Sequence, residues 1–135
     1  MRTYKLETTA TTGGAGVATS TDRFAEIVNG RVQSVDVAVL AGTAPATQDL
    51  TVRITDVDGG PVTNILVRTD TATPEGRYYP RAQAHDTTGA GMTFDGTRAV
   101  PVEIPVPATY VEVVVAQSNN GVRYTILITV DQDKP

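Results

Sequence analysis

Apolar and polar residues alternate along most of the chain with the two-residue period of a β-strand. Residues 110–115 place three valines on one face of such a strand, and the same alternation runs through residues 124–130. Between them, Asn120 and Gly121 favour a tight turn, because both residue types tolerate positive φ. The sequence therefore predicts a β-hairpin made of these two strands.

The same alternation predicts strands further upstream. Residues 31–40 form one, with Val35 and Val37 on the face opposite Val32. Residues 50–55 and 62–67 form two more, and the segment between them is rich in aspartate, glycine and proline. Such residues supply the backbone conformations of turns, so a second hairpin is predicted here.

Three further segments have weaker patterns. Residues 77–82 predict a short strand interrupted by Pro80, and residues 21–28 predict a strand or an irregular segment in preference to a helical turn. Residues 100–106 alternate with two prolines, which cannot donate to a ladder, so this strand is expected at a sheet edge. Seven to nine short strands and no helical stripe predict an all-β fold, an antiparallel β-sandwich or jelly roll.

Two segments fit a sandwich less well. Residues 8–20 are rich in threonine, glycine and alanine, which predicts a flexible, extended N-terminal arm. Residues 70–96 are polar and rich in turn formers, and a connection of this length is typical of a functional or partner-contacting loop. The expected organisation is an arm with a first strand over 1–20 and a single β-sandwich domain over 21–135.

Composition narrows the classes of partner. The 135 residues carry a net charge of -4, and the basic residues are scattered, which argues against nucleic acid as a partner. There is no cysteine, so disulfides and thiolate zinc sites are excluded. The first residues lack the apolar core of a signal peptide, and no stretch approaches a membrane span. We therefore expect a protein made or assembled in a cytoplasm, with no membrane partner.

Candidate chemistry is sparse. His85 and Asp86 could serve as an acid–base pair, although a solvated loop histidine is the simpler interpretation. Asp56 begins a segment similar to a calcium loop, but the twelfth position, Val67, is not a carboxylate, which favours a β-turn. The glycines of residues 12–16 lack the ending of a phosphate loop. We expect no enzymatic activity, no cofactor and no metal.

Several segments resemble capsid-associated proteins of tailed bacteriophages. Residues 30–37 and 44–52 resemble a strand, a short polar loop and a second strand ending in an Asp-Leu-Thr-Val sequence. The closing strands, 107–117 and 122–131 with the Asn-Asn-Gly turn between them, are also similar. The resemblance covers about residues 30–67 and 100–131, and the family most similar is the cement, or decoration, proteins of short-tailed phage heads.

The resemblance implies a small jelly roll that binds the outside of a phage head and clamps neighbouring major capsid protein subunits. It also implies a virion location after assembly in the host cytoplasm, and we expect a homodimer in preference to a trimer. Cement proteins carry no catalytic residues, so none is carried over. Our candidate interface residues come from the arm and the long loop, where exposed aromatic side chains favour protein contacts. They are Thr8, Thr12, Val17, Tyr78, Tyr79, His85 and Phe94.

Two alternatives stay open at this point. One is another virion part, such as a head fibre, a tail protein or an adaptor. The other is a carbohydrate-binding β-sandwich, which would need an aromatic platform with Tyr78, Tyr79 or Tyr110 on one face.

Overall fold

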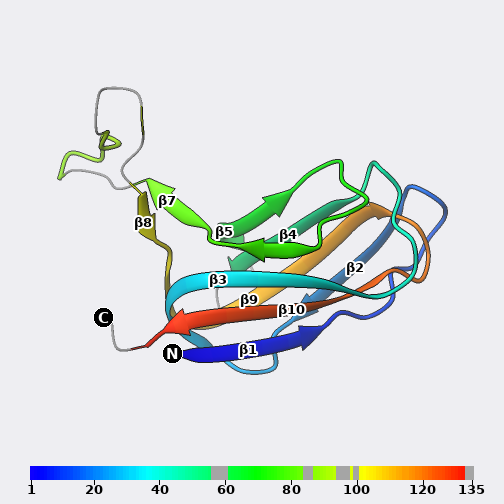
Figure 1. Ribbon diagram of the computed structural model, residues 1–135, viewed down its shortest axis with the longest axis horizontal. Coiled ribbons are helices and arrows are strands. Elements are labelled where there is room, and N and C mark those ends of the chain that lie inside the picture. Colours follow the sequence, from blue (N-terminus) through cyan, green and yellow to red (C-terminus); the bar gives the residue numbers. More distant parts are fainter. Residues whose placement is uncertain (56–60, 84–86, 94–97, 99–100, 133–135) are drawn as a thin grey trace.

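A computed structural model of the chain describes residues 1–55, 61–83, 87–93, 98 and 101–132. These residues form ten strands and no helix (Figure 1). The strands are β1 (Arg2–Glu7), β2 (Ala18–Arg23), β3 (Val28–Ala41), β4 (Asp49–Thr55), β5 (Pro61–Arg68), β6 (Gly76–Tyr78), β7 (Arg81–Gln83), β8 (Pro101–Glu103), β9 (Pro105–Ser118) and β10 (Arg123–Asp131).

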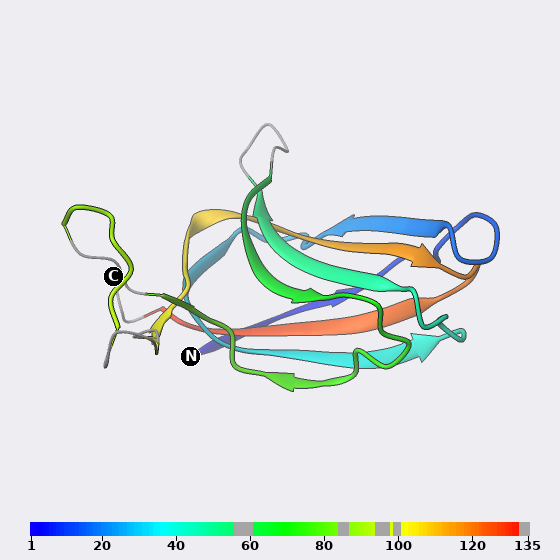
Figure 2. The ribbon, with the colours of Figure 1, turned by 90° about the horizontal axis from the view of Figure 1, so that it is seen from above.

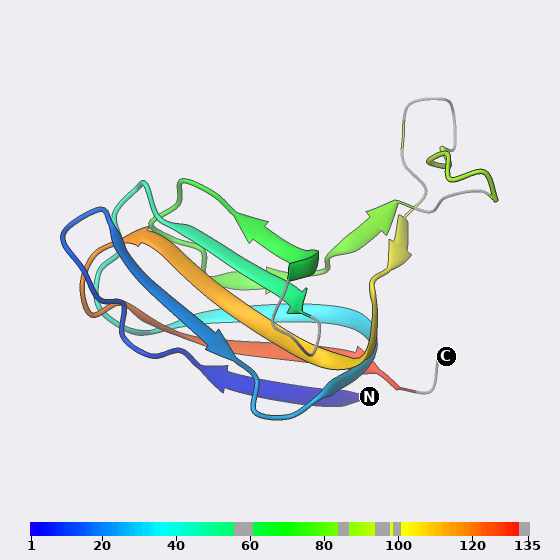
Figure 3. The same cartoon turned by 180° about the vertical axis from the view of Figure 1, so that it is seen from behind.

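Eight of the described strands form two packed layers, and every pairing among them is antiparallel. One layer has the order β1-β10-β3-β6 and the other β2-β9-β4-β5. Figure 2 shows the two layers edge-on, and Figure 3 shows the second from its outer side. The pairing of β3 with the first part of β9, Val28 opposite Thr109 and Arg31 opposite Pro105, joins the layers at one end.

The path of the chain between the layers makes this a jelly roll. Successive strands lie in opposite layers, except for β4 and β5, which are neighbours in the same one. Strands β7 and β8 form a separate pair inserted between β6 and β9. The all-β antiparallel fold predicted from the alternation is confirmed.

The predicted hairpin at residues 50–67 is confirmed by the ladder between β4 and β5, in which Leu50 lies opposite Arg68. Residues 56–60, where the calcium-loop candidate Asp56 falls, lie outside the described residues. Strand β3 also forms as predicted, but its side chains are not distributed over its two faces as the alternation predicts. A register shift against β10 near Gln33 leaves both Val32 and Val35 buried, because a bulge advances the side-chain alternation by one residue.

The predicted hairpin between residues 110–115 and 124–130 is wrong. Strand β9 pairs with β2 and β4, whereas β10 pairs with β1 and β3 in the opposite layer. Asn120 and Gly121 do lie in a turn, but it carries the chain across the core and not to a neighbouring strand. The valines of β9 therefore face the isoleucines of β10 through the core.

Residues 8–20 are not an extended flexible arm. Thr8 is fully buried, and its Oγ1 accepts a hydrogen bond of 2.9 Å from the backbone nitrogen of Tyr124. Thr11 is also fully buried, and its Oγ1 accepts a hydrogen bond from the backbone nitrogen of Val122 at the same distance. The threonines that make this segment look flexible instead supply hydroxyls to backbone groups of the C-terminal strand region. Residues 18–20 begin β2, which pairs with β9.

The core between the layers consists mainly of β-branched side chains. The alternation of β10 buries every second residue from Tyr124 to Val130, and β9 contributes its valines from the other layer. The chain has no tryptophan, and Tyr4, Phe24 and Tyr124 are its buried aromatic residues in the described part. Such a core fits the low aromatic content, since valine and isoleucine pack well on pleated surfaces.

Candidate partner-binding surface

The β7–β8 pair projects from one end of the jelly roll (Figure 1). Its register places Arg81 opposite Glu103, Ala82 opposite Val102 and Gln83 opposite Pro101. Isolated two-stranded ribbons are marginally stable in water. This ribbon therefore depends on contacts with the sandwich, or with a partner, to hold its shape.

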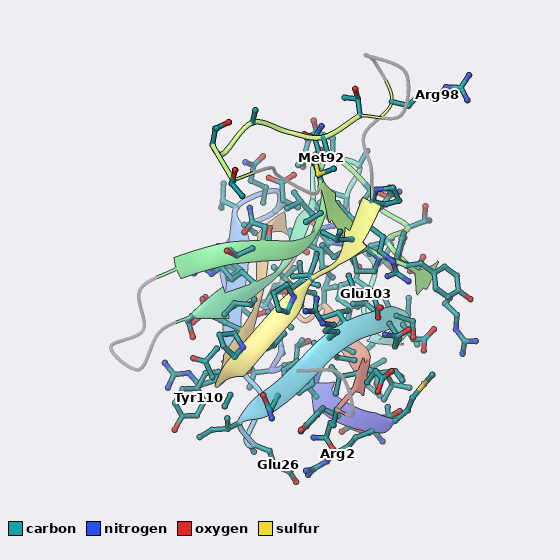
Figure 4. All side chains as sticks on the ribbon, turned by 90° about the vertical axis from the view of Figure 1, so that its left-hand side faces the viewer. Arg2, Glu26, Met92, Arg98, Glu103 and Tyr110 are labelled. Carbon is teal, nitrogen blue, oxygen red and sulfur yellow. The ribbon has the colours of Figure 1, made fainter. Side chains whose placement is uncertain are left out.

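Polar contacts anchor the base of the ribbon to β3. The Arg81 guanidinium donates to the backbone oxygens of Val32 at 3.4 Å and Gln33 at 3.3 Å. The Gln33 amide donates to the Glu103 carboxylate, and Glu103 lies beside β3 in Figure 4. One residue later, the backbone oxygen of Ile104 accepts a hydrogen bond of 2.9 Å from Val32. The ribbon is thus held in place at one end by hydrogen bonds.

The ribbon and the segment that leads into it from β6, where Tyr79 lies, present apolar side chains to solvent. Tyr79 is 63% exposed, Met92 44% and Val102 37%, and Ala82 beside Val102 is also exposed. Met92 lies farther out than Glu103 in Figure 4 and is tied to β7 by a hydrogen bond of 3.1 Å from the Gln83 amide to its backbone oxygen. We call Tyr79, Ala82, Met92 and Val102 the ribbon surface. Aromatic residues and methionine are enriched in protein interfaces.

Tyr78 differs from its neighbour Tyr79. It lies in β6, packs partly buried against the core, and donates its hydroxyl to the backbone oxygen of Pro74 at 2.6 Å. The Arg68 guanidinium lies 5.3 Å from the centre of its ring. Tyr78 therefore serves the sandwich, which leaves Tyr79 as the more accessible of the two candidate anchors.

The other predicted interface residues are scattered. Val17 is 67% exposed in the turn before β2, and Thr12 is exposed while its backbone pairs with Thr19. The segment between β1 and β2, which contains both of these residues, lies at the end of the sandwich away from the ribbon (Figure 1), whereas Thr8 is buried. His85 and Phe94 lie outside the described residues, as does Asp86. A contact role for each of these residues stays a prediction.

Val102 and Met92 are exposed near the ribbon, although the sequence pattern does not single them out as surface candidates. The alternation of residues 100–106 groups Val102 with Ile104 and Val106, and those two are indeed buried. Val102 lies in β8, and the chain enters the sandwich only from Ile104 onward, so Val102 belongs to the ribbon. Its two flanking residues, Pro101 and Glu103, were the available signal, because proline and charge beside a single valine are typical of an edge.

Tyr78 and Tyr110 do not form a joint platform for a carbohydrate ring. Tyr78 lies beside Val35 in one layer, whereas Tyr110 lies beside Thr55 in the other. The Tyr110 ring is also covered by the Arg23 guanidinium, 4.5 Å from its centre. The arrangement that the carbohydrate-binding alternative required is therefore not present for these two residues.

A buried polar cluster lies at the end of the sandwich away from the ribbon. Gln48 is fully buried just before β4. Its amide nitrogen donates to the Tyr124 hydroxyl at 2.7 Å, and its amide oxygen accepts a hydrogen bond of 2.7 Å from the Ser118 hydroxyl. Burial raises the pKa of Tyr124, and the hydrogen bond from Gln48 partly opposes that rise. All three groups satisfy one another, so the cluster connects the layers and leaves no reactive group free.

Glu112 is the most buried carboxylate of the described residues, and it is paired. It lies between Arg53 of β4 and Arg23 of β2 in the registers of β9. Arg53 Nε donates to its Oε1 at 2.7 Å. This ion pair therefore joins β9 to β4 on the outer side of one layer.

We expect Glu112→Gln to lower the free energy of unfolding by about 1–2 kcal/mol, because a charged hydrogen bond is lost in a partly dry site. Asp36→Asn is the matched control, since Asp36 pairs with the solvent-exposed Arg77. That pair should contribute less than about 1 kcal/mol. Urea unfolding of both variants measures the difference, and equal losses would contradict the structural role of Glu112.

Among residues 1–55, 61–83, 87–93, 98 and 101–132, no group of three histidine, cysteine, aspartate or glutamate side chains is placed to hold a metal ion. The same residues contain no helix that is long and apolar enough to cross a membrane.

Comparisons with known proteins add little to this surface. No protein-family model matches the chain, and no curated protein matches it. Among solved structures, a chain from the structure of infectious bursal disease virus Gx strain is similar, with a TM-score of 0.35 and 12% sequence identity. The alignment covers 99% of this chain and 33% of the viral chain, so this chain spans about a third of that length.

Proposed function

We propose that this protein is a structural component of a virion, a decoration protein that binds the outside of a phage head through its ribbon surface. The observation that carries the proposal is the projecting β7–β8 ribbon, whose apolar side chains are exposed although its base is firmly anchored. An anchored ribbon with uncovered apolar side chains suits a surface that becomes buried against a partner. In this role the protein holds capsid subunits together and performs no chemistry of its own.

The jelly roll is compatible with this role, because the architecture occurs in viral capsid domains as well as in lectins and cupins. Fold alone does not assign a function. The phage-like sequence segments support the capsid over the other classes. The partner in this proposal is the major capsid protein, and binding only the assembled shell would stabilise that shell by mass action.

A homodimer is part of the same proposal. Two ribbons on one particle would bind two capsid subunits at once, and the second binding event would profit from a high effective concentration. Light scattering on the purified protein measures the oligomeric state directly. A monomer at micromolar concentration would remove the dimer from the proposal and leave the ribbon contact to be tested alone.

The double variant Tyr79→Ser/Val102→Ser tests the ribbon contact. We expect its affinity for phage heads that lack the protein to fall at least tenfold, since a buried anchor typically contributes about 2 kcal/mol or more to binding. The measurement is co-sedimentation with such heads across a protein titration.

Val67→Ser is the matched control for that experiment. Val67 is 45% exposed on β5, away from the ribbon surface, and the change removes the same kind of side chain. It should bind heads like the wild type. If the double variant also binds like the wild type while both melt normally, the ribbon is not the capsid contact.

A further inference from the structure

The turn between β9 and β10 contains an asparagine followed by glycine, a pair with intrinsic chemical reactivity. Asn120 is exposed, and Gly121 has a φ of +82°. In such a pair the backbone nitrogen of the glycine can attack the side-chain carbonyl carbon of the asparagine. Glycine permits this attack best, because it has no Cβ to hinder the approach and the widest backbone freedom.

In the folded protein this nucleophile is occupied. The Gly121 nitrogen donates a hydrogen bond of 2.8 Å to the backbone oxygen of Thr11. Thr11 is itself fixed, because its Oγ1 donates to the backbone oxygen of Asn119 and accepts from the backbone nitrogen of Val122. The segment before β2 therefore covers the reactive nitrogen with a buried threonine.

A second pair, Asn29 and Gly30, provides a comparison within the same chain. It lies in β3 at a register shift against β9, where Gly30 is paired opposite Val106. A Cβ built on Gly30 would lie 2.8 Å from the backbone oxygen of Asp131, so the backbone here is closely packed. Ring closure needs the glycine nitrogen to swing toward the asparagine side chain, and the close packing of Gly30 against Asp131 resists that movement.

We propose that Asn120 is a site of spontaneous deamidation and isomerisation, and that Thr11 controls its rate. The Gly121 nitrogen forms a bond to Cγ of Asn120 and loses its proton, while the bond from Cγ to the amide nitrogen breaks and ammonia leaves. Water then opens the five-membered succinimide ring, giving aspartate or isoaspartate at position 120. The reaction requires the Gly121–Thr11 hydrogen bond to open, so its rate measures local unfolding of residues 8–17.

The product changes one end of the molecule only. Isoaspartate lengthens the main chain by one carbon and adds a negative charge in the connection between the two layers. The turn lies at the end of the sandwich opposite the β7–β8 ribbon (Figure 1). Modification should therefore loosen the β9–β10 connection and leave the ribbon surface unchanged.

The experiment is incubation of the full chain at mildly alkaline pH, with peptide mapping by mass spectrometry over weeks. We compare wild type, Thr11→Ala, Thr11→Ser and Thr8→Ala. Thr8→Ala is the matched control, because it removes a buried threonine hydroxyl that bonds to Tyr124 and not to the Gly121 turn. Wild type in denaturant gives the rate for the uncovered pair, and Asn29 is followed in the same digests.

The expected result is a slow conversion at Asn120 in the folded wild type and a several-fold faster one in Thr11→Ala. Thr11→Ser should restore the slow rate, and Thr8→Ala should accelerate Asn120 less than Thr11→Ala does. Conversion at Asn29 should stay slower than at Asn120 in every folded sample. The proposal is overturned if Asn120 reacts as fast in folded wild type as in denaturant, or if Thr11→Ala leaves its rate unchanged. If Thr11→Ala does not fold, the ratio between folded and denatured wild type decides alone.

Discussion

Replacing Gln48 with alanine will lower the free energy of unfolding by about 3–5 kcal/mol, because each buried hydroxyl left without a partner costs about 1–3 kcal/mol and a cavity adds to this. The two hydroxyls are those of Tyr124 and Ser118, each 2.7 Å from the Gln48 amide. For a domain of this size such a loss lowers Tm by roughly 10–20 °C. Thermal unfolding followed by circular dichroism measures it.

The control variant also removes the Tyr124 and Ser118 hydroxyls, which Gln48→Ala leaves without a partner. In the triple variant Gln48→Ala/Ser118→Ala/Tyr124→Phe no buried polar group of this cluster is left unpaired, so part of the lost stability should return. If the triple variant is less stable than Gln48→Ala by the full cost of two more substitutions, the three side chains do not act as a cluster.

The same tyrosine makes stability depend on alkaline pH. Burial raises the pKa of Tyr124 above its ordinary value of about 10, so the folded state holds the phenol proton more tightly than the unfolded state does. The stabilising contribution is complete below that value and is lost as the pH rises through the folded pKa. Unfolding free energies from pH 8 upward, taken as the difference between wild type and Tyr124→Phe, should show this decline, and a flat difference would contradict it.

Gly42→Ala is the second substitution with a large expected effect, a loss of about 3 kcal/mol or more, since it combines backbone strain with a clash. Gly42 follows β3 with a φ of +83°, and a Cβ on it would lie 2.6 Å from the backbone oxygen of Gly121 and 2.8 Å from Cα of Val122. Both contacts are with backbone, which cannot rotate away. Chemical denaturation of the purified variant measures the loss.

Gly16→Ala separates the strain from the clash. Gly16 has a similar φ of +76°, but a Cβ on it would meet no atom within 4 Å. Gly16→Ala should therefore lower the free energy of unfolding only by the cost of a left-handed backbone at a residue with a side chain, about 1–2 kcal/mol. Equal losses at the two glycines would show that the β3–β4 loop does not press against the β9–β10 turn.

The strands were predictable because alternation depends only on one face of each strand being buried. The β4–β5 hairpin was predictable too, since these two consecutive strands are true neighbours in the sheet. The β9–β10 pair has the same alternation and a stronger turn signal, yet the strands lie in opposite layers. Which strands become neighbours is decided by the packing of the whole sheet. Neither the two-residue alternation nor the turn residues determine it.

The site was predictable only in part. Tyr79 could be named because an exposed aromatic residue in a long polar segment stands out in the sequence. The burial of Thr8 and Thr11 could not be foreseen, because their hydroxyls bond to backbone groups more than a hundred residues away. A threonine-rich segment has the same composition whether it is free or packed, so composition alone could not decide between the two.

The position of β10 between β1 and β3 has a consequence for how the protein is made. Arg2 lies opposite Val130, so β1 finds its sheet neighbour only more than a hundred residues further along the chain. During synthesis, the edges of β1 and β3 that pair with β10 stay unpaired until residues 123–131 leave the ribosome. Pairings of such long sequence separation form slowly, and waiting edges attract other chains. Slow refolding and a need for chaperones at high expression are therefore built into the strand order.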